Sequence, residues 1–218
     1  MKNLILTVFT LFISSLFLNA QDTNKKNIIL GGTLGFNYSK SISGGNGQMV
    51  IAPNRGEFTE TSFSINPYIG KYLSNKFILG IDAGYAIDVL KIPFSNRDDK
   101  ATNHAYTVGI FGRYLINPDQ KLIFQIEPSA IFQYTSIGSF SSFPSINDRD
   151  KIVVGGFLAT PILSYSISPK INLIGRFGSL QFLVGYWQLS GSNDKNDFSQ
   201  FGLLLDSTTI SFGVEANL

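Results

Sequence analysis

Alternation of apolar and polar side chains is the main pattern of this chain, and it is clearest near the C-terminal end. From Ile210 to Leu218 every second residue is apolar, and the residues between them are small or polar. A period of two is typical of a β-strand with one apolar and one polar face. An isolated strand of this kind would leave an edge open to other chains, whereas in a closed barrel the last strand pairs with the first. The pattern therefore predicts a closed β-barrel.

Eight segments are predicted to be strands, and each has at least the roughly 9–11 residues that a tilted membrane strand needs. No stretch of the mature chain repeats at the helical period of about 3.6 residues. The predicted fold class is therefore all-β, an eight-stranded antiparallel up-and-down transmembrane β-barrel. The predicted strands are Ile28–Ser39, Thr61–Leu73, Phe77–Val89, His104–Ile116, Leu122–Thr135, Ile152–Ile167, Ile171–Leu189 and Phe198–Leu218.

The connections between these strands alternate between short and long. Residues 74–76, 117–121 and 168–170 form short turns, and each turn ends in a lysine. The four remaining connections are long and polar, and they cover residues 40–60, 91–103, 138–151 and 190–197. Barrels of the outer membrane have tight turns on the periplasmic side and longer loops outside. This rhythm predicts four extracellular loops and an even number of strands.

Charged residues on the polar face of the strands are predicted to lie inside the barrel. The inward set contains Asp82, Arg113, Glu127, Arg176 and Glu215. A lipid-facing Arg or Lys at mid-depth costs about 2–4 kcal/mol, and the interior of an eight-stranded barrel is just wide enough for side chains to fill. We expect Arg113 and Arg176 to neutralise the three carboxylates in one network that fills the lumen. The alternative is a charged constriction in a narrow pore.

The pattern does not decide, for three parts of the chain, which side chains face lipid and which face the lumen. Lys71 faces lipid if Phe63, Ile65 and Ile69 do, but the similarity of its strand to that of Arg113 would place it inside, where Asp206 could also lie. The sixth segment is apolar at both parities, so its phase is undetermined. The seventh changes phase near Gly178-Ser179, which indicates a β-bulge.

Aromatic residues gather near the ends of the predicted strands. Rings of amphipathic aromatic side chains at both membrane interfaces are typical of transmembrane barrels. The two predicted girdles comprise Tyr38, Tyr106, Tyr134 and Trp187 near the long loops, and Tyr72, Tyr114 and Tyr165 near the short turns.

The N-terminal segment predicts export. Lys2 precedes an apolar run, and Leu18-Asn19-Ala20 resembles a cleavage site, so residues 1–20 are expected to be a signal peptide and residues 21–218 the barrel domain. An uncleaved anchor is the alternative. The chain has no Cys, which excludes disulfides and a lipid-attachment cysteine. Its net charge of +2 gives no basic surface for nucleic acid.

Candidate chemistry is sparse. His104 is the one histidine, and we expect it to be an interfacial residue with no catalytic role. Asp98, Asp99, Asp148 and Asp150 carry oxygen ligands suited to weak calcium binding, but neighbouring Arg and Lys favour solvated loop tips. No cluster has the spacing of a metal site, and no helix follows the Gly44–Gly47 run as phosphate binding requires. We expect no catalytic, metal or cofactor site.

Two stretches carry a resemblance to a known family. Asn66-Pro67-Tyr68-Ile69-Gly70 leads through a short turn to the next strand, and the end of the chain resembles the signal that the barrel-insertion machinery reads, with Ser211, Gly213, Ala216 and Leu218 in its positions. Leu218 stands where that signal usually has an aromatic residue. The mature chain resembles the small outer-membrane β-barrel proteins common in Bacteroidota, similar in architecture to OmpX and to the transmembrane domain of OmpA.

The resemblance implies a location in the outer membrane of a Gram-negative bacterium. It also implies outer-membrane lipids as surroundings, periplasmic chaperones and the insertion machinery as assembly partners, and an extracellular ligand for the loops. We expect a non-enzymatic integral membrane protein with a filled lumen and a structural or surface-interaction role. The alternatives are a narrow porin-like channel for ions or small solutes and a lipid- or peptide-modifying enzyme.

Overall fold

The computed structural model describes residues 28–42, 57–94, 97–138, 150–188, 195–204 and 210–218. The predicted signal peptide, residues 1–20, lies outside this range. Within it, no helix is long and apolar enough to cross a membrane. The strands are β1 (Ile28–Ile42), β2 (Glu57–Ser74), β3 (Phe77–Phe94), β4 (Arg97–Leu115), β5 (Leu122–Ser136), β6 (Lys151–Ser168), β7 (Ile171–Phe177), β8 (Ser179–Gln188), β9 (Lys195–Leu204) and β10 (Ile210–Asn217).

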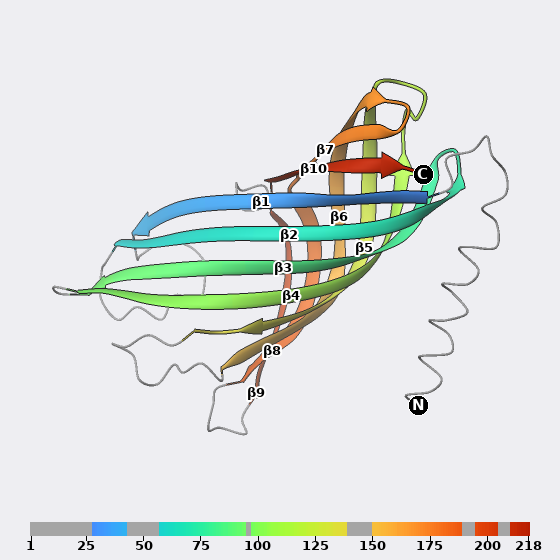
Figure 1. Ribbon diagram of the computed structural model, residues 1–218. Coiled ribbons are helices and arrows are strands. Elements are labelled where there is room, and N and C mark those ends of the chain that lie inside the picture. Colours follow the sequence, from blue (N-terminus) through green and yellow to red (C-terminus); the bar gives the residue numbers. More distant parts are fainter. Residues whose placement is uncertain (1–27, 43–56, 95–96, 139–149, 189–194, 205–209) are drawn as a thin grey trace.

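The strands pair into one antiparallel ring. Pairing follows chain order from β1 to β6, and β6 then pairs with both β7 and β8. β8 pairs with β9, β7 pairs with β10, and β10 returns to β1 (Figure 1). β7 and β8 therefore form one strand of the barrel wall, and β9 and β10 form the next. The wall has eight strands, and the predicted eight-stranded antiparallel β-barrel is confirmed.

The break between β7 and β8 is the bulge that the sequence predicts near Gly178. β6 pairs Ile162 with Arg176 but Ala159 with Leu180, so the two strands differ by one residue over this interval. Gly178 has a φ of 65°, a left-handed conformation that glycine adopts without steric cost. The extra residue shifts the alternation of inward and outward positions by one. As a result, β7 and β8 both place apolar side chains outward.

The predicted second outer loop, residues 91–103, is wrong in extent. β3 and β4 stay paired up to Phe94 and Arg97, and only residues 95–96 lie outside the described chain. The sequence reads as a loop there because its residues are charged and polar. A strand that extends beyond the hydrocarbon needs no apolar face, since water can solvate it. The β3–β4 hairpin is therefore longer than predicted.

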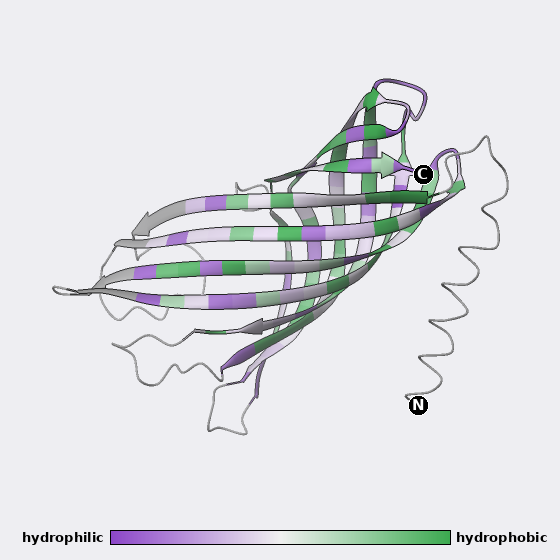
Figure 2. Cartoon of the chain, in the orientation of Figure 1, coloured by the Kyte–Doolittle hydropathy of each residue, from purple (hydrophilic) through white to green (hydrophobic). Residues whose placement is uncertain are grey.

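An apolar belt covers the outside of the barrel. Outward positions on the strands carry large exposed apolar side chains, and hydrophilic and hydrophobic bands follow one another along the nearer strands β1 to β4 in Figure 2. A soluble monomer seldom exposes a contiguous apolar area of this extent. The belt includes Leu30, Leu34, Phe36, Ile65, Val108, Ile110, Phe124, Ile126, Phe132, Phe157, Leu173, Phe182, Phe212 and Val214.

Strand register shows which side chains of β6 and β2 face the lumen. Directly paired residues share a face, and β5 pairs Gln125 with Ile162 and Glu127 with Thr160. The even-numbered residues of β6 therefore face inward. In β2, Tyr68 and Gly70 are buried, which puts Lys71 on the outward face near the turns. Lys71 is thus outside the lumen, because its partner on β3 is the outward Leu79.

An apolar layer fills the inside of the barrel at the end that carries the short turns, which we call the turn end. It consists of buried side chains from six wall strands, Ile29, Ile78, Leu115, Ile123, Ile162 and Ile174. Two of the turns share a detail, because the Ser74 and Ser168 hydroxyls each accept a hydrogen bond from the backbone N–H two residues later, at 3.3 Å. The turns and this layer close the turn end.

Candidate functional site in the barrel lumen

Arg113 lies at the centre of the lumen. It is an inward residue of β4 and is 0% exposed. Its Nε and Nη2 donate to Glu127 Oε2 of β5 at 2.9 and 2.7 Å. A guanidinium presents fixed donors that suit a carboxylate. Because both donors reach one oxygen, the other oxygen of Glu127 remains available to a second cation.

Glu215 approaches Arg113 from β10. Arg113 Nη1 donates to Glu215 Oε2 at 2.5 Å, and the Tyr68 hydroxyl donates to the same oxygen at 2.9 Å. Asn172 Nδ2 donates to the other oxygen, Glu215 Oε1, at 3.2 Å. Both carboxylate oxygens of Glu215 therefore have partners, as a charge removed from water requires.

Arg176 of β7 completes the ion-pair network. Its Nη2 lies 2.9 Å from Glu127 Oε1. Two guanidinium groups then face two carboxylates, so the net charge of the four side chains is zero. They come from four wall strands, and they form one connected set across the lumen. We call this set, Arg113, Glu127, Arg176 and Glu215, the lumen cluster.

Two aromatic rings enclose the central guanidinium. Arg113 Cζ lies 4.9 Å from the ring centroid of Tyr68 and 5.2 Å from that of Phe111, within reach of cation–π attraction. The two rings meet edge to face, with centroids 5.8 Å apart. Each ring lies over an inward glycine: a Cβ on Gly31 would stand 2.5 Å from the Tyr68 ring, and one on Gly80 would meet Phe111. The glycines therefore provide the room that the rings need.

Asp82 departs from the predicted network. It lies on the inward face of β3, and its Oδ1 is buried beside the Cα of Gly109. No ion pair among the described residues includes Asp82, and its Oδ1 has no hydrogen-bond partner there. The structure thus brings together four of the five predicted charges. The fourth carboxylate candidate, Asp206, lies outside the described residues.

The aromatic girdle prediction needs two corrections. Tyr72 and Trp187 face inward, whereas the other five tyrosines lie outward and exposed. Tyr72 packs against the apolar layer and its hydroxyl donates to Asn217 Oδ1 at 3.1 Å. Trp187 pairs with the inward Ile152. Nearness to a strand end led to both assignments, but parity along the strand decides the face. The outward set is Tyr38, Tyr106, Tyr114, Tyr134 and Tyr165.

The single histidine lies on the outer surface of β4. Tyr85 Oη and His104 Nδ1 are 2.9 Å apart, and their rings stack with centroids at 6.2 Å. The described residues contain no group of three or more Asp, Glu or His side chains that could hold a metal ion. Of the predicted calcium candidates, Asp150 is buried, and the side chains of the other three lie outside the described residues.

The residues of the predicted assembly signal lie on β10 or directly after it. Ser211 and Gly213 face the lumen, whereas Ala216 shares the outward face of Leu30, its partner on β1. Leu218 follows the strand and exchanges backbone hydrogen bonds with Ile28, at 2.9 and 3.4 Å. These bonds tie the final residue of the chain to the first described residue of β1.

Sequence reasoning missed two members of the lumen site. Tyr68 and Asn172 both bind Glu215, and both occupy inward positions between apolar outward neighbours. The prediction considered formal charges alone. A search for every polar side chain at inward parity would have found both, because a buried carboxylate needs neutral donors as well as cations.

Comparisons with known proteins give likenesses in structure. No protein-family model matches the chain, and no curated protein matches it in sequence. Neisserial surface protein A aligns at 14% identity over 89% of this chain and 98% of that protein, with a TM-score of 0.45. The outer membrane protein OprG from Pseudomonas aeruginosa aligns at 12% identity over 87% of this chain and 93% of that protein, with a TM-score of 0.47. The translocator domain of the autotransporter NalP from Neisseria meningitidis aligns at 10% identity over 98% of this chain and 95% of that domain, with a TM-score of 0.37.

Proposed function

We propose that this chain is a non-enzymatic integral protein of a Gram-negative outer membrane, exported with the help of residues 1–20. The outward apolar belt supports this location, because only a hydrocarbon environment makes such a surface favourable. The strand ring, closed by seven residue pairs between β1 and β10, pairs backbone groups within the protein, as a bilayer demands. Periplasmic chaperones and the barrel-insertion machinery are then the partners expected during assembly.

A filled lumen is the observation that carries the proposed function. Arg113 is fully buried between Glu127 and Glu215, which come from different wall strands. The apolar layer at the turn end lies between this cluster and the short turns. An ion that crossed the barrel would have to break paired charges and pass a dry layer, and both steps are costly. This arrangement supports an anchoring role for the barrel and not a pore.

Recognition would then belong to the outer end of the barrel. Rigid scaffolds often carry their binding residues on connecting segments. The longest described hairpin, β3–β4, extends its pairing to Phe94 and Arg97 and could present such a surface on a firm support. The proposed role is structural, or interaction at the cell surface with an extracellular ligand.

Conductance across a planar bilayer tests this proposal. The purified barrel should give no discrete current steps at voltages where a porin control conducts. Reproducible single-channel steps would contradict the filled lumen and would favour the narrow-channel alternative. To test the enzyme alternative, lipid and peptide hydrolysis should be compared between the native chain and His104→Ala. Hydrolysis by the native chain that disappears in the variant would overturn the non-enzymatic assignment.

A further inference from the structure

The charged side chains of the barrel are divided unevenly between its two ends. Apart from the lumen cluster and Asp82, the described residues of the turn end carry four lysines and one acidic side chain, Asp119, a net charge of +3. The described residues of the outer end carry six basic and seven acidic side chains, a net charge of −1. The turn end is therefore a basic surface. Its lysines are Lys71, Lys76, Lys121 and Lys170.

Three of these lysines occupy equivalent positions. Lys76, Lys121 and Lys170 each end a short turn, and each backbone carbonyl accepts a hydrogen bond from the next wall strand at 2.8 Å. The N–H groups of Lys76 and Lys170 also donate to the serine hydroxyl two residues earlier. The backbone of each lysine is thus held in place, while its side chain is exposed. Neighbouring turns lie two wall strands apart, about 10 Å across the strands, which is comparable with the Debye length of about 8 Å, so the fields of the ammonium groups overlap.

Lys71 differs from the other three because it lies on the lipid-facing side of the wall. Its directly paired partners are Ile28 on β1 and Leu79 on β3. Two residues away on β2, Ile69 and Leu73 are 37% and 57% exposed. All four neighbours are apolar, and no ion pair among the described residues includes Lys71. The side chains around Lys71 on this face therefore supply no negative charge.

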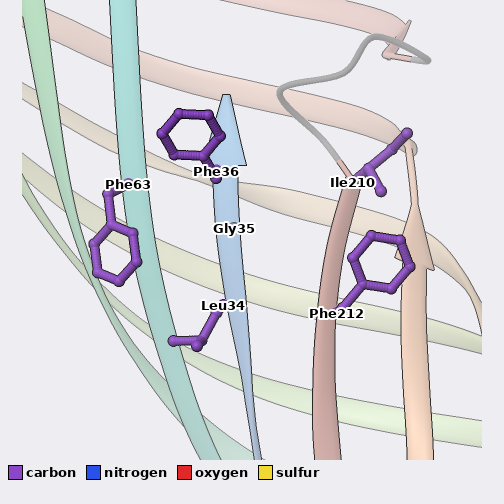
Figure 3. Close-up of a pocket in the computed structure, with 6 residues that line it drawn as sticks. All are labelled: Leu34, Gly35, Phe36, Phe63, Ile210 and Phe212. Atoms are coloured by element: carbon purple, nitrogen blue, oxygen red, sulfur yellow. The ribbon is translucent and has the colours of Figure 1, made fainter. Parts of the chain in front are cut away.

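Lys71 marks the edge of the apolar belt. Farther toward the outer end of the same wall, Leu34 and Phe36 on β1 and Phe63 on β2 present only carbon to the outside (Figure 3). Lys76 follows in the turn, three residues before the β3 partner of Lys71, so the two lysines are about 10 Å apart along the strand. Their long, flexible side chains can approach one anion from two sides.

We propose that Lys71 and Lys76 bind the head group of an anionic phospholipid at the turn of the β2–β3 hairpin. The inference rests on the proposed membrane location. A cation at the edge of the apolar belt needs a negative partner, and the surrounding side chains offer none. An anionic lipid brings a net negative charge to this depth, whereas a zwitterionic lipid brings a cation with its phosphate. A protein partner would place amide groups against the apolar neighbours of Lys71, which is costly in hydrocarbon.

Fluorescence quenching by brominated lipids tests the site. In a Trp187→Phe background, which has no other tryptophan, Leu73→Trp places an indole beside Lys71, and Phe63→Trp places one on the same face of the same strand, far from it. The full barrel would be reconstituted in phosphatidylcholine vesicles with a minority of phosphatidylglycerol, and either lipid would carry bromine on its chains. We expect phosphatidylglycerol to be enriched about fivefold around Leu73→Trp, the ratio that roughly 1 kcal/mol gives, and not around Phe63→Trp. Both leaflets contain the same mixture, so the orientation of the barrel does not affect the result.

Two matched pairs of substitutions locate the effect. Lys71→Gln with Lys76→Gln should abolish the enrichment around Leu73→Trp. Lys91→Gln with Lys100→Gln removes the same charge from two exposed, directly paired residues of the β3–β4 hairpin and should leave the enrichment unchanged. If both lipids quench but the enrichment is absent, survives the loss of Lys71 and Lys76, or disappears in both variants, the anionic-lipid site is overturned and the membrane location stands. Absence of quenching by either lipid at both tryptophan positions would instead overturn the membrane location.

Discussion

Arg113 and Glu215 join opposite sides of the barrel through a direct ion pair, with Nη1 2.5 Å from Oε2. Arg113 lies on β4 and Glu215 on β10, and three wall strands separate them in either direction around the ring. Neither residue is exposed, so bulk water cannot solvate one charged side chain if the other is removed. The ion pair therefore links opposite walls of the barrel and should stabilise the fold.

Replacing Arg113 with Met should destabilise the barrel strongly. The substitution keeps a long side chain but leaves Glu215 and Glu127 buried without their main cation. Removing one partner of a buried ion pair typically costs about 3–5 kcal/mol. Urea unfolding in lipid vesicles measures the change in the free energy of unfolding. Lys71→Met removes a cation from the outward face near the turns and should change that free energy by less than about 0.5 kcal/mol. Equal changes in the free energy of unfolding for the two substitutions would contradict a stabilising role of this ion pair.

A methyl group on Gly31 should also destabilise the barrel. The new Cβ would stand 2.5 Å from the Tyr68 ring, so the ring must move and its hydrogen bond to Glu215 weakens. Overpacking of this kind costs roughly 1–3 kcal/mol. Gly32→Ala is the matched control, because its Cβ would meet its nearest neighbour at an ordinary 3.6 Å. Thermal unfolding of both variants checks the prediction, and a Gly31→Ala barrel as stable as Gly32→Ala would refute it.

The only tryptophan of the chain should be shielded from lipid. Trp187 faces inward beside Ile152, whereas Tyr186, at nearly the same depth, faces outward. Lipids brominated along their acyl chains should therefore quench the fluorescence of the native protein weakly. The double variant Tyr186→Trp with Trp187→Phe moves the indole to the outer face and should be quenched clearly more. Strong quenching of the native protein would show that Trp187 contacts lipid and belongs to the outer girdle.

The alternation of side chains was sufficient to predict the wall of the barrel, because each strand contacts lipid on one face and the lumen on the other. β5 shows this, since every outward residue from Leu122 to Tyr134 is apolar. β6 could not be phased from sequence because its inward face is apolar too, with Ile152, Val154 and Ile162. Only the register with β5 reveals which face is which.

Contacts across the lumen were less accessible to sequence reasoning. Parity placed Arg113, Glu127, Arg176 and Glu215 on the inward face, but the strand register and barrel diameter decide which of them meet. Asp82 has the correct parity and still lies outside the network. Tyr72 and Trp187 were assigned by their distance from strand ends, and the register places them inside.

Closure of the barrel between β1 and β10 is the central claim, and one disulfide tests it directly. Ile28 and Leu218 exchange both backbone hydrogen bonds, so Leu30 and Ala216, two residues further along each strand, form the same kind of pair. Such pairs place their Cα atoms about 5.5 Å apart, a separation suited to a disulfide. The chain has no Cys of its own, so an introduced pair has no competitor.

The measurement is disulfide formation in the folded, membrane-inserted double variant Leu30→Cys with Ala216→Cys. The ring predicts a rapid intramolecular bond on mild oxidation. The control pair Leu30→Cys with Phe212→Cys, offset by four residues or about 13 Å along the strand, should remain reduced. Bond formation in both pairs, in neither pair, or only between separate molecules would contradict a barrel closed in this register.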